Sequence, residues 1–340
     1  LLLLLKQTAE SPDRAQALNL GYDRSPVALG SFRDFVFGHD LAQPLKIALA
    51  WIEKDPIEIA DPAGRRKNIL FRGEGLRFDV TIRGTEKGLT HVESFAYSLD
   101  GSRFEMRRKD GSGSAYELVP KAGAFHFRRA KGRPWPLPAP VKCYGFPDEV
   151  RAYFQNAGFL SELELAFERL MQRIYYLGPL REYPKRQYIW SGGQPENVGP
   201  RGERAVDALL ASRARRQLIS RGKGKKRHSL EQHVAHWLRE LGLIEEFRVE
   251  EIEPESNLYR VTVRKGAHSA PVLVTDVGFG VSQVLPVLVL CFYVPEGSTV
   301  ILEQPEIHLH PAVQAGLADA LIEAVQLRNI QVIVESHSEH

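Results

Sequence analysis

Acidic and amide side chains follow a short apolar segment near the carboxyl end of the chain. The β-branched residues of 299–302 predict a buried strand, and Glu303, Gln304 and Glu306 come directly after it, interrupted by a proline. Ligands bind at the carboxyl ends of strands in an open α/β sheet. Carboxylate oxygens at that place suit Mg²⁺, a hard cation that prefers oxygen ligands. The pattern therefore predicts a magnesium site, and the alternative is a strand that simply ends in exposed acids.

Two glycines, Gly278 and Gly280, precede an apolar segment of helical length. They allow the backbone to turn closely, and we expect Ser282 to be the N-cap of the helix that follows. A helix N-terminus presents free N–H groups and the positive end of the helix dipole, which favour phosphate. The segment predicts a phosphate-binding helix N-terminus, and the alternative is a turn that binds nothing.

A second apolar segment, 330–335, predicts another buried strand, and His337 follows it. A lone histidine at the end of a strand is more often structural than catalytic. The order of the three motifs adds information, because the glycine turn lies about twenty residues before the acidic strand and the histidine about thirty after it. Alternating buried strands and helices predict an α/β sheet here.

In this order the motifs resemble the C-terminal half of an ABC-type ATPase head. The most similar group is that of the SMC-like and overcoming-lysogenization-defect-like ATPases, often described as AAA family ATPases. The resemblance assigns Gly278, Gly280, Ser282 and Gln283 to the signature loop, Glu303 and Gln304 to the Walker B strand, His308 and His310 to the D-loop, and His337 to the switch histidine. The segment 176–182 (YLGPLRE) also resembles this group, so the likeness extends more loosely back to residue 176.

The resemblance implies an α/β fold, an ABC-type P-loop NTPase head with a β-rich antiparallel element in its N-terminal lobe. It implies ATP and Mg²⁺ as ligands, with Glu303 nearest the metal and the signature helix acting on nucleotide held by a second subunit. ATP binding would then drive association into a homodimer or a higher homo-oligomer, and hydrolysis would release it. An effector nuclease in a partner chain, and a role in bacterial DNA-related or antiphage defence, follow by analogy alone.

The sequence departs from the family pattern in two places. ABC-type heads carry Asp-Glu where this chain has Glu303-Gln304, and an amide cannot serve as a general base. Glu306 is therefore expected to polarise the attacking water. The alternatives are slow hydrolysis, or a native glutamate at 304 that was replaced to trap ATP.

The second departure is that no G-x-x-x-x-G-K-[ST] loop occurs in the 340 residues. In this family that loop opens a helix near the N-terminus, and the segment 1–8 resembles the continuation of such a helix. We therefore expect the loop upstream of Leu1 and further residues beyond His340. The chain as given is expected to be inactive without that loop.

Two other functions stay open. A metal-dependent hydrolase or nuclease could use the carboxylates and imidazoles gathered near two strand ends. These residues are Glu303, Glu306, His308, His310, Glu335, His337 and His340. Against this hypothesis, His310 fits the N-terminal boundary of an amphipathic helix that begins at Pro311. The other alternative is a degenerate ATPase that acts as a binding scaffold.

The chain divides into three predicted segments. Residues 1–147 form the rest of the N-terminal lobe, with an antiparallel meander at about 57–129. Residues 148–229 hold a helical segment, expected over 148–176, and a long loop that is rich in glycine, proline and basic residues. Residues 230–340 form the C-terminal lobe. The basic side chains of the loop, Arg221, Lys223, Lys225, Lys226 and Arg227, predict either contact with nucleic acid or phosphate, or a solvated loop.

Composition excludes several classes of protein. The chain has 45 Lys and Arg, 42 Asp and Glu, and a formal net charge of +3, too small to imply nucleic-acid binding by itself. Its two cysteines, Cys143 and Cys291, cannot form a disulfide framework, which favours a reducing, cytoplasmic location. We find no apolar segment of membrane-spanning length and expect no membrane partner.

Overall fold

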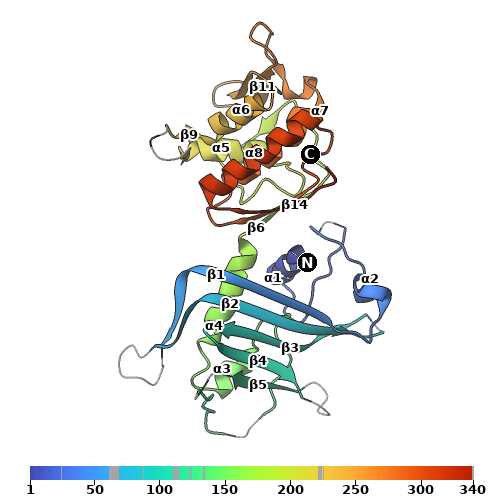
Figure 1. Cartoon of the computed structure of the whole chain (residues 1–340), viewed down its shortest axis with the longest axis vertical. Helices are drawn as coiled ribbons and strands as arrows, with labels where there is room; N and C mark the ends of the chain where they lie inside the picture. Colours follow the sequence, from blue (N-terminus) through green and yellow to red (C-terminus); the bar gives the residue numbers. More distant parts are fainter. Residues whose placement is uncertain are drawn as a thin grey trace. The chain divides into compact units, whose positions relative to one another are not determined.

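The computed structural model describes residues 1–23, 25–60, 69–86, 88–109, 115–121, 123, 125–132, 135–220, 224 and 226–338. The protein is a mixed α/β chain of two compact units, Leu1–Gln172 and Arg173–His340 (Figure 1). The boundaries expected at 147/148 and 229/230 do not coincide with this division. The three-segment organisation stays a prediction.

An antiparallel sheet dominates the first unit, as the alternating sequence patterns predict. Its strands are β1 (Leu45–Ala60), β2 (Ile69–Gly84), β3 (Thr90–Leu99), β4 (Ser102–Arg108) and β5 (Tyr116–Lys121), hydrogen-bonded in chain order. The sheet begins earlier than the expected residue 57, because residues 45–52 pair with 75–82. Asp100 and Gly101, both at positive φ, make the tight β3–β4 turn.

The helices of this unit are α1 (Leu2–Glu10), α2 (Phe32–Phe35), the 3₁₀ turn η1 (Phe37–His39), α3 (Asp148–Tyr153) and α4 (Leu160–Gln172). Helix α4 packs on the sheet, where Phe167 contacts Phe78 with ring centroids 4.8 Å apart. A continuous helix over 148–176 is wrong. The helix is interrupted at Phe154, whose backbone is extended and bridges to Arg129, and its expected end is instead a strand.

The second unit begins with four short strands and two helices. They are β6 (Ile174–Leu177), β7 (Tyr188–Ile189), α5 (Ala205–Ala214), β8 (Leu218–Ile219), β9 (His228–Ser229) and α6 (Leu230–Glu240). Helix α6 starts with a capping box between Ser229 and Gln232, at the residue that the sequence predicts. Helix α5 lies inside the segment expected to be a long loop.

The rest of the second unit consists of β10 (Glu246–Glu251), β11 (Leu258–Arg264), β12 (Val272–Leu273), the 3₁₀ turn η2 (Val274–Asp276), α7 (Phe279–Tyr293), β13 (Thr299–Glu303), α8 (Pro311–Arg328) and β14 (Gln331–Glu335). Strands β10, β11, β12 and β7 form an antiparallel sheet. Strand β13 pairs in parallel with β6 on one side and β14 on the other. Every residue of α7 from Val281 to Tyr293 is buried, so this helix is the centre of the core.

Strand β14 differs from its prediction in burial. Its apolar sequence predicts a strand covered on both faces, but Ile333 is 38% and Val334 43% exposed. The physical reason is position, because β14 is at one end of the three-stranded order, with β13 as its hydrogen-bonded neighbour.

A carboxyl group under the antiparallel sheet gives a test of the first unit. Burial raises the pKa of Glu164 to about 7, although its Oε1 accepts a hydrogen bond from the Phe146 amide. The folded protein therefore holds a proton here at pH values where the unfolded chain has released it. Because the unfolded state then binds fewer protons, the free energy of unfolding falls as pH rises from about 4.5 to about 7.

Glu164→Gln should remove this part of the pH dependence, on the order of a few kcal/mol between about pH 5 and pH 7.5. Urea unfolding of both proteins at a series of pH values measures it. Glu162→Gln, on an exposed position of the same helix, is the matched control. An unchanged pH profile in Glu164→Gln would show that another group titrates.

Candidate functional site

The carboxyl ends of three parallel strands meet at one edge of the second unit. The pairing aligns Glu303 with Glu335 and Leu302 with Leu177. The Gln304 amide continues the contact by donating to the Glu335 carbonyl at 2.8 Å. Side chains that follow β6, β13 and β14 are therefore neighbours, as the sequence predicts for the last two strands.

Glu303, the last residue of β13, is half-buried and held by residues that follow β6 or belong to it. The Tyr176 hydroxyl donates to Glu303 Oε2 at 2.9 Å, and Arg181 Nη2 donates to the Glu303 carbonyl at 3.3 Å. Burial and this bond raise the pKa of Tyr176, so the phenol stays a donor. Glu303 therefore has a fixed carboxylate, and its Oε1 has no hydrogen bond from the described residues and can bind a ligand.

Tyr176 and Arg181 are functional candidates that sequence reasoning did not assign. The signal was present, since both lie in the segment 176–182 that resembles the ATPase group. Arg181 is 6% exposed, and its Nε and Nη1 are buried without a hydrogen-bond partner among the described residues. Burial lowers the pKa of this guanidinium to about 10, so it is charged at neutral pH.

Glu306 follows a tight turn in which Gln304 takes a positive φ of 45°. Its Oε1 accepts a hydrogen bond from the His337 amide at 2.8 Å, and its Oε2 is buried with no partner in the described part of the chain. Burial acts to raise the pKa of Glu306, but hydrogen bonds from backbone amides and from Ser336 outweigh it and lower the pKa. Glu306 is thus an ionised carboxylate with one unused acceptor oxygen.

The three predicted histidines have separate environments. His337 is exposed, and its Nε2 lies 3.1 Å from Glu335 Oε1. His308 is exposed and adopts a positive φ of 62°. His310 is the N-cap of α8, as predicted, and its Nδ1 accepts a hydrogen bond from the Ala312 amide at 3.3 Å.

These positions do not gather into a metal site of the hydrolase type. Within the described residues, which exclude His340, no three His, Cys, Asp or Glu side chains are grouped so that they could hold a metal ion. His310 also uses a ring nitrogen for helix capping. The hypothesis of a Glu/His-ligated hydrolase therefore has no geometric support.

The signature segment differs from its prediction in one detail. Helix α7 begins at Phe279, its N-cap is Gly278, and Ser282 lies inside the first turns, 7% exposed. The Ser282 hydroxyl donates to the Phe279 carbonyl at 2.8 Å, so the expectation that Ser282 caps the helix is wrong. With Gly278 as the N-cap, the helix starts four residues earlier than it would with Ser282 as the N-cap.

The burial of this segment decides which groups can meet a ligand. Gln283 is 8% exposed, whereas Gly278 and Phe279 are exposed and Gly280 is half-buried. The exposed backbone amides at the start of α7 are therefore the groups that could contact a phosphate.

Only part of the predicted basic segment is described. Lys226 and Arg227 are exposed, which fits either a solvated loop or a contact with an anion. Arg221, Lys223 and Lys225 lie outside the described residues. The nucleic-acid hypothesis for this segment stays a prediction.

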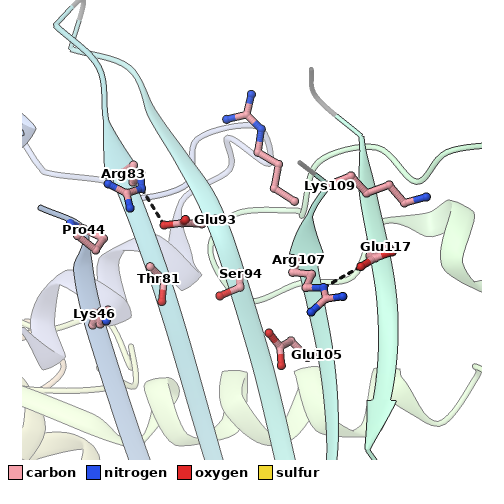
Figure 2. A pocket seen from close by; sticks show the side chains of 11 residues that line it. Pro44, Lys46, Thr81, Arg83, Glu93, Ser94, Glu105, Arg107, Lys109 and Glu117 are labelled. Carbon is pink, nitrogen blue, oxygen red and sulfur yellow. Dashed lines mark hydrogen bonds and ion pairs between the residues drawn. The ribbon is translucent and has the colours of Figure 1, made fainter. Parts of the chain in front are cut away.

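A polar hollow also lies on the antiparallel sheet of the first unit (Figure 2). Its charges are largely paired, with Arg83 Nε 2.8 Å from Glu93 and Arg107 Nε 2.7 Å from Glu117. It contains none of the predicted site residues. The predicted site residues belong by position to the second unit, 173–340.

None of the described helices is both long and apolar enough to cross a membrane. No curated protein matches the chain. Among solved structures, the SMC head domain from Thermotoga maritima matches with 8% identity and a TM-score of 0.30, over 83% of this chain and 70% of that one. A similarity of this size carries no argument about function.

A family of sequences gives the decisive comparison. The family described as "AAA domain, putative AbiEii toxin, Type IV TA system" matches residues 84–340. The match contains β6, α7, β13 and β14, and so all the elements that form the edge described above. Because it spans well over half of the chain, this protein belongs to that family of AAA-domain ATPases.

Proposed function

We propose that this chain binds and hydrolyses ATP, and that two copies associate when ATP is bound. The observation that carries the proposal is that two carboxylates lie at the carboxyl edge of the parallel sheet: Glu303 ends β13, and Glu306 accepts a hydrogen bond from the amide of His337, which follows β14. The alternative of a binding scaffold without hydrolysis is favoured by Gln304, which cannot act as a base.

The donor set at this edge fits Mg²⁺. Mg²⁺ in nucleotide sites uses one or two carboxylates and completes its shell with waters and phosphate oxygens. Glu303 offers one oriented carboxylate. The Tyr176 hydroxyl donates a hydrogen bond to its Oε2, and its Oε1 could bind the ion. The ion would supply positive charge to stabilise negative charge that develops on the phosphate.

Glu306 is the residue that we assign to the attacking water. It is ionised, fixed by the His337 amide, and retains an unused oxygen. A positioned carboxylate of this kind can accept the proton of a water. Glu306 would thus perform the role that the amide of Gln304 cannot.

The start of α7 supplies the reason for association. Its exposed N-terminal amides favour phosphate, and the family resemblance implies that they act on nucleotide in a second copy. Binding of ATP would then join two heads, and hydrolysis would separate them. Control of an effector nuclease, contact with DNA, and a role in defence belong to the proposal by analogy.

A cytoplasmic location is also part of the proposal. Cys143 and Cys291 are both free and buried, as expected for a protein that folds in a reducing compartment.

Residues 1–340 alone should bind ATP weakly, because they contain no phosphate loop, whose backbone amides and lysine make most phosphate contacts. Isothermal titration with MgATP measures this. A longer version of the protein that carries such a loop should bind at least tenfold more tightly, following about 1.4 kcal/mol per factor of ten. Micromolar affinity of the 340-residue chain would contradict the prediction.

In the longer version, Glu306→Gln should leave ATP binding intact and lower kcat on the order of 10²-fold, since it removes a general base without changing size. Glu303→Ala should weaken the dependence of binding on Mg²⁺ and abolish hydrolysis. Steady-state hydrolysis and Mg²⁺ titrations measure both effects. Unchanged turnover in Glu306→Gln would show that another residue accepts the proton of the attacking water. If the parent protein does not hydrolyse ATP but still associates when ATP is bound, the binding scaffold without hydrolysis is favoured.

Gly278 allows a test of association in which the helix itself is preserved. A Cβ at Gly278 would meet no atom within 4 Å, and Asp is at least as good an N-cap as Gly. Gly278→Asp should therefore keep helix α7 stable while its carboxylate repels phosphate. ATP-dependent association and hydrolysis should fail, whereas Gly278→Ser, a neutral N-cap, should retain both. Light scattering with and without ATP measures association, and normal association of Gly278→Asp would overturn the role of α7.

A further inference from the structure

An arginine is buried at the carboxyl edge of the parallel sheet with most of its donors unused. Arg181 is 6% exposed, and its Nη2 donates a hydrogen bond to the Glu303 carbonyl. Its Nε and Nη1 are buried and make no hydrogen bond to the described residues. A guanidinium has five donors, and leaving them unpaired in the interior destabilises the folded state. A purely structural arginine would be expected to use more of them.

The backbone on either side of Arg181 is held by hydrogen bonds. The Gly178 amide donates to the Pro200 carbonyl and the Glu182 amide to the Arg201 carbonyl, both at 2.8 Å. These two bonds clamp the loop on either side of Arg181. Glycine at 178 suits this close approach, since a Cβ there would lie 2.8 Å from the Tyr176 hydroxyl and 3.3 Å from the Pro200 carbonyl oxygen.

The neighbouring groups define what the unused donors could bind. Glu303 and Glu306 supply negative charge that helps to keep Arg181 protonated. Glu306 Oε2 is itself buried without a partner in the described residues. The edge therefore holds unused donors and an unused acceptor, as expected for a site completed by an anion and a water.

We propose that Arg181 is a phosphate-binding residue, whose guanidinium N–H groups bind the terminal phosphate of a nucleoside triphosphate. A guanidinium is always charged, and its several N–H donors make it suited to phosphate oxygens. The inference rests on the proposed function and adds to it a phosphate ligand outside any glycine-rich loop. It also gives a role to a buried charge whose Nε and Nη1 have no hydrogen-bond partner among the described residues.

The test uses the 340-residue chain with sodium phosphate and sodium tripolyphosphate as probes. Sodium chloride at equal ionic strength is the baseline, and the midpoint of thermal unfolding is the readout. An anion that binds the folded state raises this midpoint as its concentration increases. We expect a rise for the parent chain, larger for tripolyphosphate, and loss of most of the rise in Arg181→Met. Arg201→Met is the control and should keep the rise, because Arg201 lies in the neighbouring segment before α5, is exposed and is paired with Glu182.

A second readout separates binding from support of the loop. Without phosphate, Arg181→Met should unfold at the same temperature as the parent or higher, because it removes an unpaired buried charge. A lower midpoint would assign Arg181 a structural role and count against the proposal. An unchanged phosphate response in Arg181→Met, or no response in the parent, would overturn it. If Arg181→Met does not fold, Arg181→Lys replaces it, because lysine keeps the charge and loses the planar guanidinium. Arg181→Lys should then lose most of the rise in the unfolding midpoint with phosphate, and an unchanged rise would overturn the proposal.

Nucleotide titrations distinguish this inference from the proposed function. In the longer version with a phosphate loop, Arg181→Met should weaken ATP binding about tenfold more than ADP binding, since one charged hydrogen-bonding group is lost. Equal losses for ATP and ADP would show that Arg181 does not contact the terminal phosphate. If the phosphate response depends on Arg181 but ATP does not bind, the anion site stands and the ATPase proposal fails.

Discussion

Parallel pairing of β13 with both β6 and β14 is the constraint on which the rest of the second unit depends. Parallel strands end on the same side of a sheet, so this pairing brings the residues after Leu177, Glu303 and Glu335 to one edge. Parallel strands also need helical connections and apolar cover. The largely apolar helix α7 and the longer α8 meet that need, and the burial of α7 supplies much of the core.

The candidate site lowers the stability of the fold that holds it. Arg181 and the Oε2 atom of Glu306 are buried polar groups without partners in the described residues, and each such group costs on the order of 1–3 kcal/mol. The apolar core behind them, including Val284, Leu288 and Phe292, offsets this cost. Unsatisfied groups that survive in such a place are typical of sites that bind a ligand.

The first unit is built on a different principle. Its antiparallel strands follow one another along the chain, and fully buried aromatic rings such as Phe78, Phe95 and Phe104 form its core. The family match begins at Gly84, the last residue of β2, and therefore includes only part of this sheet. The groups that we assign to ATP lie in the second unit, and the sheet carries none of them.

Local patterns determined much of the second unit. Strand β13, helix α6 and the His310 cap follow from apolar periodicity, capping residues and proline position, which act over a few residues. The acidic residues at the end of β13 could be assigned for the same reason. Only the tertiary structure decided that residues 174–177 form a strand, that β14 is exposed, and that α7 starts at Phe279. It alone brought Tyr176 and Arg181 to Glu303, across sequence separations of 127 and 122 residues. The physical reason is that strand partners and buried side-chain contacts depend on distant segments, about which the local sequence carries no information.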